Sequence, residues 1–305
     1  MKKILLITGA TATGKTKLAI ECAKKFDGEI ISCDSMQIYK HLDIGTAKPT
    51  KCELKQAKHY MIDIVEPNEE FSVSQFVDLA MQKIEDIQSR GKLAIVVGGT
   101  GLYLKSLIYP YSFCLSKKNQ EIRDKYNKIL EQKGKEYLFD LLQKVDFESS
   151  KNIHPNDTKK IVRALEIFET TGKKKSEQTT EQSNLRYDFV MVSLTSNRQV
   201  LYERINKRVD EMFNLGLENE IKNLLNKNLV NRNSQSMSAI GYKEFFDYFD
   251  NKNTLEQTKE LIKINSRHYA KRQETFIRGL PNVKWFDLQL DKNQIMDYIN
   301  SQLSQ

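Results

Sequence analysis

The residues from Gly9 to Thr16 carry the clearest chemical signal in the sequence. They read Gly-Ala-Thr-Ala-Thr-Gly-Lys-Thr, directly after the apolar run 4–7 and directly before a helical pattern. This is the phosphate-loop pattern of Gly, four residues, Gly, Lys and Ser or Thr, in the strand, turn and helix context that it requires. Glycines let successive backbone N–H groups face one anion, and the N-terminus of the next helix adds its positive end. We therefore expect a diphosphate or triphosphate to bind here.

Two side chains of the loop have predicted roles of their own. Lys15 supplies a positive charge, and the Thr16 hydroxyl is placed to coordinate Mg²⁺. The predicted diphosphate-binding residues are Gly9, Ala10, Thr11, Ala12, Thr13, Gly14, Lys15 and Thr16. The structural alternative is a glycine-rich turn without a ligand. The loop by itself is compatible with transfer, hydrolysis or expulsion of the bound phosphates.

Asp34 is the candidate carboxylate, because it follows a predicted strand at 29–33. It has three possible roles: a general base toward a bound acceptor, an outer ligand of Mg²⁺, or the cap of the next turn. Phosphate-loop ATPases and GTPases normally place a metal-organising Asp after a later strand. Here the apolar strand at 93–97 runs into Gly98-Gly99 instead. The ATPase acid is therefore missing from its usual place.

Short apolar strands alternate with helices through much of the chain. The pattern predicts strands at 3–8, 29–33, 60–65, 93–97 and 187–195, and helices at 15–26 and between Ser72 and Gly91. This alternation indicates an α/β fold, with a parallel phosphate-loop sheet and helices on both faces. Ligands of such sheets bind beyond the carboxyl ends of the strands, where Thr8, Asp34 and Gly98 lie.

The pattern changes near Ser116, where the chain becomes helical and highly charged. One helix is expected to begin after His154-Pro155-Asn156-Asp157 and to end at Gly172, and the polar stretch 173–183 is expected to be mobile. The predicted organisation is a first part of the catalytic core at 1–114, an inserted all-helical domain at 115–185, and the second part of the core at 186–305.

The last long helix, predicted at 254–278, carries Lys263, Arg267 and Lys271 at i, i+4 spacing. Cations at this spacing repel one another, which is tolerated if they meet phosphates. A solvated helix face, balanced by neighbouring acids, is the alternative. After Trp285 the chain is expected to add an edge strand and a helix.

Composition indicates a globular protein with an excess of positive charge. The 305 residues carry a formal net charge of +8, which suits either an anionic partner or a solvated Lys-rich surface. The cysteines, Cys22, Cys33, Cys52 and Cys114, form no Cys-x-x-Cys pair, so neither a zinc site nor a redox dithiol is encoded. With no signal-like or membrane-spanning apolar run, we expect a cytoplasmic protein with no membrane partner.

Eight segments, in the same order along the chain, resemble those of bacterial tRNA dimethylallyltransferases. The most specific is Asp43-Ile-Gly-Thr-Ala-Lys-Pro49. The others are 9–16, Asp34-Ser-Met-Gln-Ile-Tyr39, Val97-Gly-Gly-Thr-Gly-Leu-Tyr103, His154-Pro-Asn-Asp157, Arg163-Ala-Leu-Glu166, Ile240-Gly-Tyr242 and Ala270-Lys-Arg-Gln273. Ala10 departs from the Pro that is usual in the family, at a position that offers backbone to the ligand.

The resemblance implies transfer of the dimethylallyl group of dimethylallyl diphosphate to N6 of the tRNA adenine just 3′ of the anticodon, with diphosphate as the other product. In the family this adenine is position 37, and the preferred tRNAs read codons beginning with U. The phosphate loop and Mg²⁺ at Thr16 would then stabilise a departing diphosphate. An adenine stacked in the anticodon stem-loop must be flipped out to reach the pocket. We expect the protein to act as a monomer.

The resemblance also implies roles for individual residues. Asp34 would orient N6 and take its proton, Thr100 would contact the target nucleotide, and Arg208 would neutralise diphosphate, although a single Arg in a Lys-rich helix is often a surface cation. The implied tRNA-binding residues are Asp34, Ser35, Met36, Gln37, Thr100, Arg123, Lys159, Lys160, Ile161, Val162, Arg163, Arg267, Lys271, Arg272 and Gln273.

Two other functions use the same loop. A nucleoside or nucleotide kinase would transfer the γ-phosphate of ATP, but the missing Asp after 93–97 and the basic helical insertion disfavour it. A non-catalytic RNA-binding protein could retain a structural phosphate site. The presence of Lys15, Thr16 and Asp34 together argues against a protein that has lost its catalytic activity.

Overall fold

The computed structural model describes residues 3–110, 119–177, 185–287 and 290–304. Contacts between Cα atoms group the chain into two compact units, Met1–Ile108 with Leu185–Gln305, and Tyr109–Asn184. The second unit therefore runs from Tyr109 to Asn184, compared with the expected insertion at 115–185. Cys114 and the boundary between 114 and 115 lie outside the described residues, as do residues 178–183 of the polar stretch expected to be mobile.

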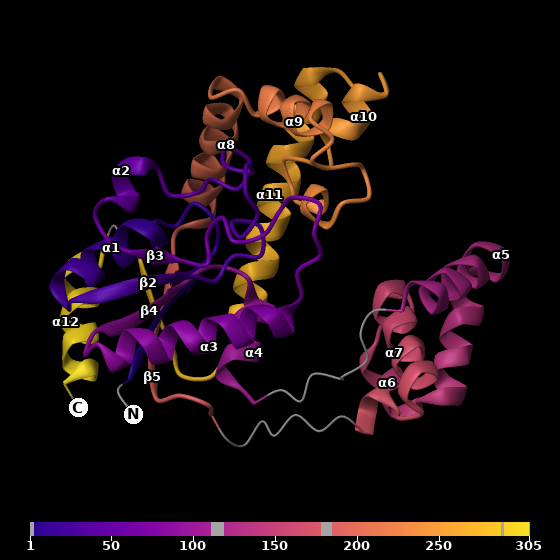
Figure 1. Ribbon diagram of the computed structural model, residues 1–305, viewed down its shortest axis with the longest axis horizontal. Coiled ribbons are helices and arrows are strands. Elements are labelled where there is room, and N and C mark those ends of the chain that lie inside the picture. Colours follow the sequence, from indigo (N-terminus) through magenta and orange to yellow (C-terminus); the bar gives the residue numbers. More distant parts are fainter. Residues whose placement is uncertain (1–2, 111–118, 178–184, 288–289, 305) are drawn as a thin grey trace. The chain divides into compact units, whose positions relative to one another are not determined.

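The first unit is built on a parallel sheet (Figure 1). Its strands are β1 (Ile4–Gly9), β2 (Gly28–Ser32), β3 (His59–Tyr60), β4 (Leu93–Val97), β5 (Phe189–Thr195) and β6 (Val283–Asp287), in the order β3-β2-β4-β1-β5-β6. All paired strands run parallel, with Ile7 beside Val97 and Thr8 beside Ser193. The α/β fold expected from the sequence is confirmed, and the carboxyl ends of β1, β2 and β4 lie at one edge.

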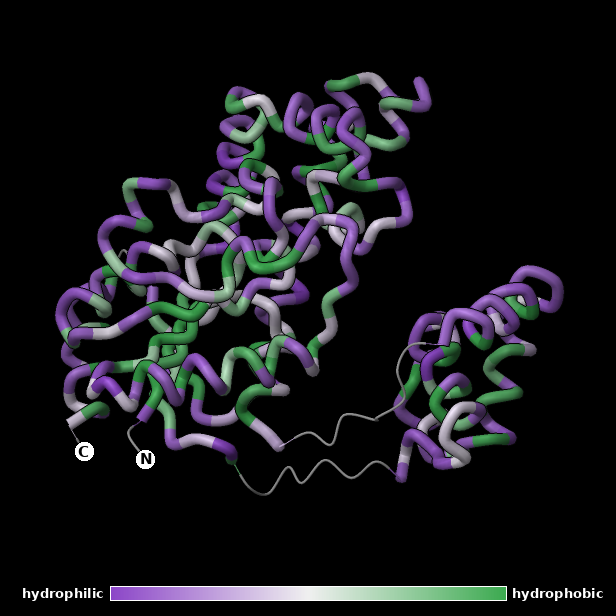
Figure 2. Tube along the Cα trace, in the orientation of Figure 1, coloured by the Kyte–Doolittle hydropathy of each residue, from purple (hydrophilic) through white to green (hydrophobic). Residues whose placement is uncertain are grey.

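Both faces of this sheet are buried. On one face, α1 (Lys15–Lys25) and α12 (Lys292–Leu303) pack against a cluster that includes Leu5, Ile95 and Val192. Alternate strand residues such as Leu6 and Val96 are equally buried and face the other side, where α3 (Val73–Ser89) contacts β2 and β4, and α4 (Gly101–Ile108) packs on α3. Figure 2 shows the apolar stretches gathered in the strands, between helices of mixed character. Burial on both faces explains why the strands read as continuous apolar runs.

The predicted third strand at 60–65 is wrong beyond its first residue. Only His59 and Tyr60 pair with β2, because Met61 and Asp63 adopt left-handed backbone angles, with φ of 63° and 55°. Val65 makes only an isolated bridge to Tyr39. The other predicted strands and helices are found within a residue or two of their expected ends, and the C-terminal strand and helix are present as β6 and α12.

The remaining helices of the first unit are α2 (Lys51–Leu54), α8 (Arg198–Asn214), α9 (Leu217–Asn226), η2 (Gln235–Ser238), α10 (Phe245–Phe249) and α11 (Leu255–Ile277). Helices α8 and α11 pack side by side (Figure 1). Lys259 and Lys263 of α11 both pair with Asp210 of α8, at 2.8 and 3.0 Å. Lys263 also pairs with Glu260 of its own helix at 2.9 Å, so these two carboxylates neutralise its charge within the fold. Among the described residues, no helix combines the length and apolar character needed to cross a membrane.

The second unit is helical. It contains α5 (Gln120–Val145), interrupted at Gly134, then α6 (Phe147–Asn152), α7 (Thr158–Thr171) and the short η1 (Lys175–Glu177). The Asp157 side chain caps α7, and Gly172 ends it with φ of 69°. Leu138 and Leu142 of α5 pack against Ile161 and Leu165 of α7. The helix predicted from the His-Pro-Asn-Asp segment is therefore confirmed.

Gly98, directly after β4, passes too close to β2 to carry a side chain. A Cβ there would lie 2.1 Å from the Cys33 carbonyl oxygen. We expect Gly98→Ala to lower the free energy of unfolding by about 2 kcal/mol, because backbone must shift to relieve the overlap. The control is Gly279→Ala, whose Cβ would sit 3.4 Å from the Phe276 carbonyl, with an expected change under about 0.5 kcal/mol. Equal urea midpoints for the two variants would contradict this account.

Candidate active site

The phosphate loop joins β1 to α1 and has the backbone geometry its sequence predicts. Gly9, Ala12 and Gly14 have φ of 138°, 62° and 91°. A Cβ on Gly9 would lie 2.4 Å from the Leu194 carbonyl oxygen, so the loop passes against β5. The Thr13 hydroxyl donates to the Ala10 carbonyl at 2.8 Å. The loop is therefore preformed, with the N-terminus of α1 directed at the same position.

Two buried cations meet at this loop, and the nearby carboxylates of Asp34, Glu53 and Glu211 compensate them only in part. The Lys15 amine donates to the Ala10 carbonyl at 2.6 Å, and Arg208 of α8 donates to the Thr11 hydroxyl at 3.3 Å. Burial, and then repulsion from Arg208, lower the pKa of Lys15 to about 7, although Asp34 opposes the shift. Burial likewise lowers the pKa of Arg208, again opposed by Asp34. A bound anionic ligand would raise both pKa values again, because it stabilises the charged forms of the two side chains.

The loop is tied to the neighbouring strand end by Gln273 of α11. Its amide oxygen accepts from the Thr11 N–H at 2.9 Å, and its amide nitrogen donates to the Gly99 carbonyl at 3.0 Å. A Cβ on Gly99 would lie 2.2 Å from that nitrogen, which explains the glycine. The Gln273 side chain is buried and lines the cavity beside the loop, so its two hydrogen bonds help to fix the shape of the site.

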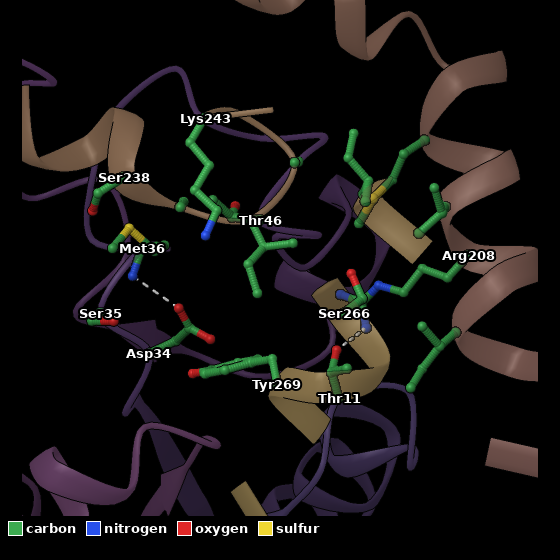
Figure 3. Close-up of a pocket in the computed structure, with 18 of the residues that line it drawn as sticks. Thr11, Asp34, Ser35, Met36, Thr46, Arg208, Ser238, Lys243, Ser266 and Tyr269 are labelled. Atoms are coloured by element: carbon green, nitrogen blue, oxygen red, sulfur yellow. Dashed lines mark hydrogen bonds between the residues drawn. The ribbon is translucent and has the colours of Figure 1, made fainter. Parts of the chain in front are cut away.

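Asp34 follows β2 and has one oxygen engaged in the turn behind it. Its Oδ1 accepts from the backbone N–H groups of Met36 at 2.9 Å and Gln37 at 3.3 Å. Figure 3 shows the other oxygen turned toward the cavity. The Thr100 hydroxyl accepts from the Ser35 N–H at 3.1 Å, which fixes the same turn from the β4 side. The capping role of Asp34 is present, and it leaves one oxygen available for chemistry.

Two cavities meet at Asp34. One, of about 260 Å³, lies against the loop and is lined by Lys15 and Thr16. The other, of about 320 Å³, is lined by Ser35, Met36 and the 238–243 segment. The residues that line both are Thr11, Asp34, Thr46, Arg208 and Tyr269 (Figure 3). A molecule in one cavity can thus react with a molecule in the other beside a carboxylate and a guanidinium.

Sequence reasoning missed three side chains of this junction. Tyr269 of α11 lines both cavities, and burial, with Asp34 as a lesser cause, raises its pKa to about 12. Thr46 belongs to the most specific of the recognised segments, which was a usable signal. Lys243 points into the larger cavity from the 239–243 segment (Figure 3). The one sequence feature that indicated a role for Lys243 is its position directly after the Ile-Gly-Tyr segment.

Comparison with known proteins identifies the family of this chain. A family model described as IPP transferase matches residues 37–280. A tRNA dimethylallyltransferase of Bacillus cytotoxicus is 48% identical over 305 residues, covering 99% of this chain and 96% of that protein. The chain belongs to the IPP transferase family.

Solved structures of IPP transferases have the same fold. A tRNA isopentenylpyrophosphate transferase from Bacillus halodurans shares 42% sequence identity with a TM-score of 0.75, covering 100% of this chain and 97% of that one. A eukaryotic dimethylallyltransferase acting on tRNA shares 34% identity with a TM-score of 0.80, covering 98% of this chain and 78% of that one.

In this IPP transferase, the residues predicted to bind tRNA in the helical unit differ in exposure. Lys159 and Lys160 are exposed at the start of α7. Ile161 and Val162 are buried in the core of that unit, so their side chains face away from solvent. Arg123 and Arg163 pair with the buried Glu166 at 2.9 and 2.8 Å. Helical periodicity alone places successive residues of a continuous segment on different faces.

The predicted tRNA contacts on α11 also separate by face. Lys271 and Arg272 are exposed, and they lie with His268 and Phe276 around a shallow hollow. Arg267 donates to the Asn206 side chain at 2.6 Å and is half-buried. The exposed pair is therefore the part of α11 best placed to meet a phosphate backbone.

The lowered pKa of Lys15 predicts proton uptake on ligand binding. In the empty loop Lys15 loses its proton above about pH 7, whereas a bound diphosphate favours the ammonium and raises that pKa. The affinity for dimethylallyl diphosphate should therefore fall by up to about tenfold per pH unit between pH 7 and 9. Calorimetry in buffers of different ionisation enthalpy should detect the uptake. Lys15→Arg is the control, because its guanidinium stays charged; the same pH slope in both proteins would contradict the assignment.

Proposed function

We propose that this protein transfers the dimethylallyl group of dimethylallyl diphosphate to N6 of adenine 37 of tRNA, next to the anticodon, in tRNAs that read codons beginning with U. The products are N6-(dimethylallyl)adenosine and diphosphate. The observation that carries the proposal is the meeting of a phosphate-loop cavity and a second cavity at Asp34 and Arg208. Family membership and the names of the relatives support the same reaction.

The phosphate side would hold the leaving group. As the allylic C–O bond breaks, its electron pair moves onto the diphosphate oxygen. The loop N–H groups, Lys15 and Arg208 stabilise the charge that develops there. Both cations already touch the loop, so little rearrangement is needed. This use of the loop requires no γ-phosphate and no acid after β4.

The acceptor side would hold the flipped adenine. Its N6 electron pair forms the new bond to the allylic carbon, and a proton leaves N6. The free oxygen of Asp34 is placed to accept that proton, because the other oxygen is held by the turn at Met36 and Gln37. Thr100 supports this geometry by holding Ser35, and Tyr269 would contact the flipped nucleotide as a donor, since its raised pKa keeps it protonated.

Mg²⁺ is the cofactor that the residues fit. Thr16 is the second residue of α1 and lines the phosphate cavity with Asp34. Its hydroxyl would share the ion with diphosphate oxygens, since Mg²⁺ prefers oxygen ligands and keeps several waters. The described residues contain no cluster of three or more His, Cys, Asp or Glu for a metal, so most of the ligands would come from substrate and water. The ion would add charge neutralisation for the leaving group.

The tRNA would be held by exposed cations on each unit. In the core unit these are Lys271 and Arg272, and in the helical unit Lys159 and Lys160. Such a protein would work in the cytoplasm, where tRNA is available, and one chain contains the whole of the described site, which supports action as a monomer.

A direct assay tests the proposal. The protein is incubated with undermodified tRNA, Mg²⁺ and either labelled dimethylallyl diphosphate or labelled ATP, and the RNA is then digested. We expect label from dimethylallyl diphosphate in N6-(dimethylallyl)adenosine. Transfer of label from γ-labelled ATP to an acceptor would instead indicate a kinase, and tRNA binding with no transfer of either label would indicate a non-catalytic RNA-binding protein.

Asp34→Ala should lower kcat by about 100-fold or more, because among the described residues Asp34 is the carboxylate that lines both cavities and can accept the N6 proton. The dissociation constant for tRNA, measured by filter binding, should stay within about threefold of that of the unmodified protein. Loss of tRNA binding with full kcat at saturating tRNA would make Asp34 a docking residue instead.

Lys271→Ala combined with Arg272→Ala should weaken tRNA binding and reduce the slope of log Kd against log salt by about one to two, because two phosphate contacts are lost. The matched control is Lys24→Ala combined with Lys25→Ala, which removes two exposed cations at the C-terminal end of α1. If both double variants show the same salt slope as the unmodified protein, this face of α11 is a solvated surface that does not bind tRNA.

A further inference from the structure

We infer that Glu220 of α9 is a positioning residue for dimethylallyl transfer, because its carboxylate anchors the 43–47 segment that supports the Asp34 turn. This inference rests on the proposed function. Glu220 does not itself line either cavity at the junction. It acts through a chain of hydrogen bonds that begins on α9 and ends at Asp34.

The anchor is a set of four hydrogen bonds to one carboxylate. Oε2 accepts from the backbone N–H groups of Asp43 at 2.9 Å and Ile44 at 2.8 Å. Oε1 accepts from the N–H of Gly45 at 3.2 Å and from the Tyr242 hydroxyl at 2.6 Å. Hydrogen bonds to an ionised acceptor are stronger than neutral ones, so three successive amides of the segment are fixed at once.

Tyr242 forms the surface on which this segment rests. Its ring is fully buried, and a Cβ on Gly45 would lie 2.4 Å from it. Burial, followed by the nearby Glu220 carboxylate, raises the pKa of Tyr242 well above its usual value, so its hydroxyl remains a donor. Gly45 thus allows the close approach that lets Glu220 and Tyr242 hold the segment together.

Gln37 connects the 43–47 segment to Asp34 by hydrogen bonds. Its side-chain amide donates to the carbonyls of Thr46 at 3.3 Å and Ala47 at 3.2 Å. Its backbone N–H donates to Asp34 Oδ1 at 3.3 Å. Displacing the 43–47 segment therefore removes both acceptors of the Gln37 amide nitrogen, although its amide oxygen still accepts from the Ser32 hydroxyl at 3.0 Å. Part of the orientation of the Asp34 carboxylate is then lost. Thr46 would shift as well, and it lines both cavities.

Glu220→Gln is the primary test. An amide cannot accept on both sides, so one end would set an N–H₂ group against backbone donors. We expect kcat for dimethylallyl transfer to fall about 10-fold to 100-fold, because a small misplacement of reacting groups has effects of that size. Directly measured dissociation constants for tRNA and dimethylallyl diphosphate should stay within about threefold, since the groups that contact the ligands remain.

Glu218→Gln is the matched control. Glu218 is on the same helix, accepts from the Tyr248 hydroxyl at 3.1 Å and pairs with Lys222, but lines neither cavity and holds no residue of the 43–47 segment. We expect its kcat to stay within about twofold of the unmodified protein. Tyr242→Phe is a milder variant that removes one of the four bonds, and it should lower kcat less than Glu220→Gln. It also provides the test if Glu220→Gln fails to fold.

A double-mutant cycle with Asp34→Asn distinguishes the positioning of Asp34 by Glu220 from a general disturbance of the structure. If Glu220 acts through Asp34, then Glu220→Gln should lower the residual kcat of Asp34→Asn by less than about threefold. Amide exchange at Asp43, Ile44 and Gly45 should also accelerate in Glu220→Gln, while exchange in α11 does not. An unchanged kcat, or an equal fold-loss in both backgrounds, would overturn the inference. Absence of transfer by the unmodified protein would instead refute the proposed function, and the exchange result would still report on the anchor.

Discussion

The site depends on unbalanced positive charge at the carboxyl edge of the sheet. Lys15 and Arg208 both lie against the phosphate loop, and Asp34 is a carboxylate close to both of them. Burial makes this arrangement unfavourable in the empty protein, which is why the pKa of Lys15 falls to about 7. A diphosphate restores the balance, and its departure as a product places charge where the cations already are.

The scaffold brings these groups together from distant parts of the chain. The parallel sheet places the ends of β1, β2 and β4 side by side, so that the loop, Asp34 and Gly98 share one edge. Helices α8 and α11 then add Arg208, Tyr269 and Gln273 from the second half of the core. Gln273 links the loop to the β4 end, and the missing side chain of Gly99 leaves room for the Gln273 amide.

Buried and half-buried polar groups on the outer helices complete the site without touching the cavities. Glu220 holds the backbone of 43–45, and Glu244 accepts from the Gly241 N–H at 2.8 Å on the opposite wall. Tyr242 connects the two walls through its bond to Glu220. Fixed walls reduce the reorganisation needed when two substrates meet, because the hydrogen bonds that shape the cavity are made before either binds.

The sequence by itself determined the phosphate loop, the alternating strands and helices, and the position of Asp34 at a strand end, because these depend on local spacing and periodicity. It could not determine the end of β3, where left-handed residues at Met61 and Asp63 override an alternating pattern. Contacts across the fold decided which cations are free for RNA: Lys263 is neutralised by Asp210, whereas Lys271 and Arg272 face solvent. They also decided the hydrogen bonds of Gln273 and Glu220, whose partners are far away in sequence. Such contacts form only when packing brings a side chain next to backbone that is distant in sequence, so no local sequence pattern predicts them.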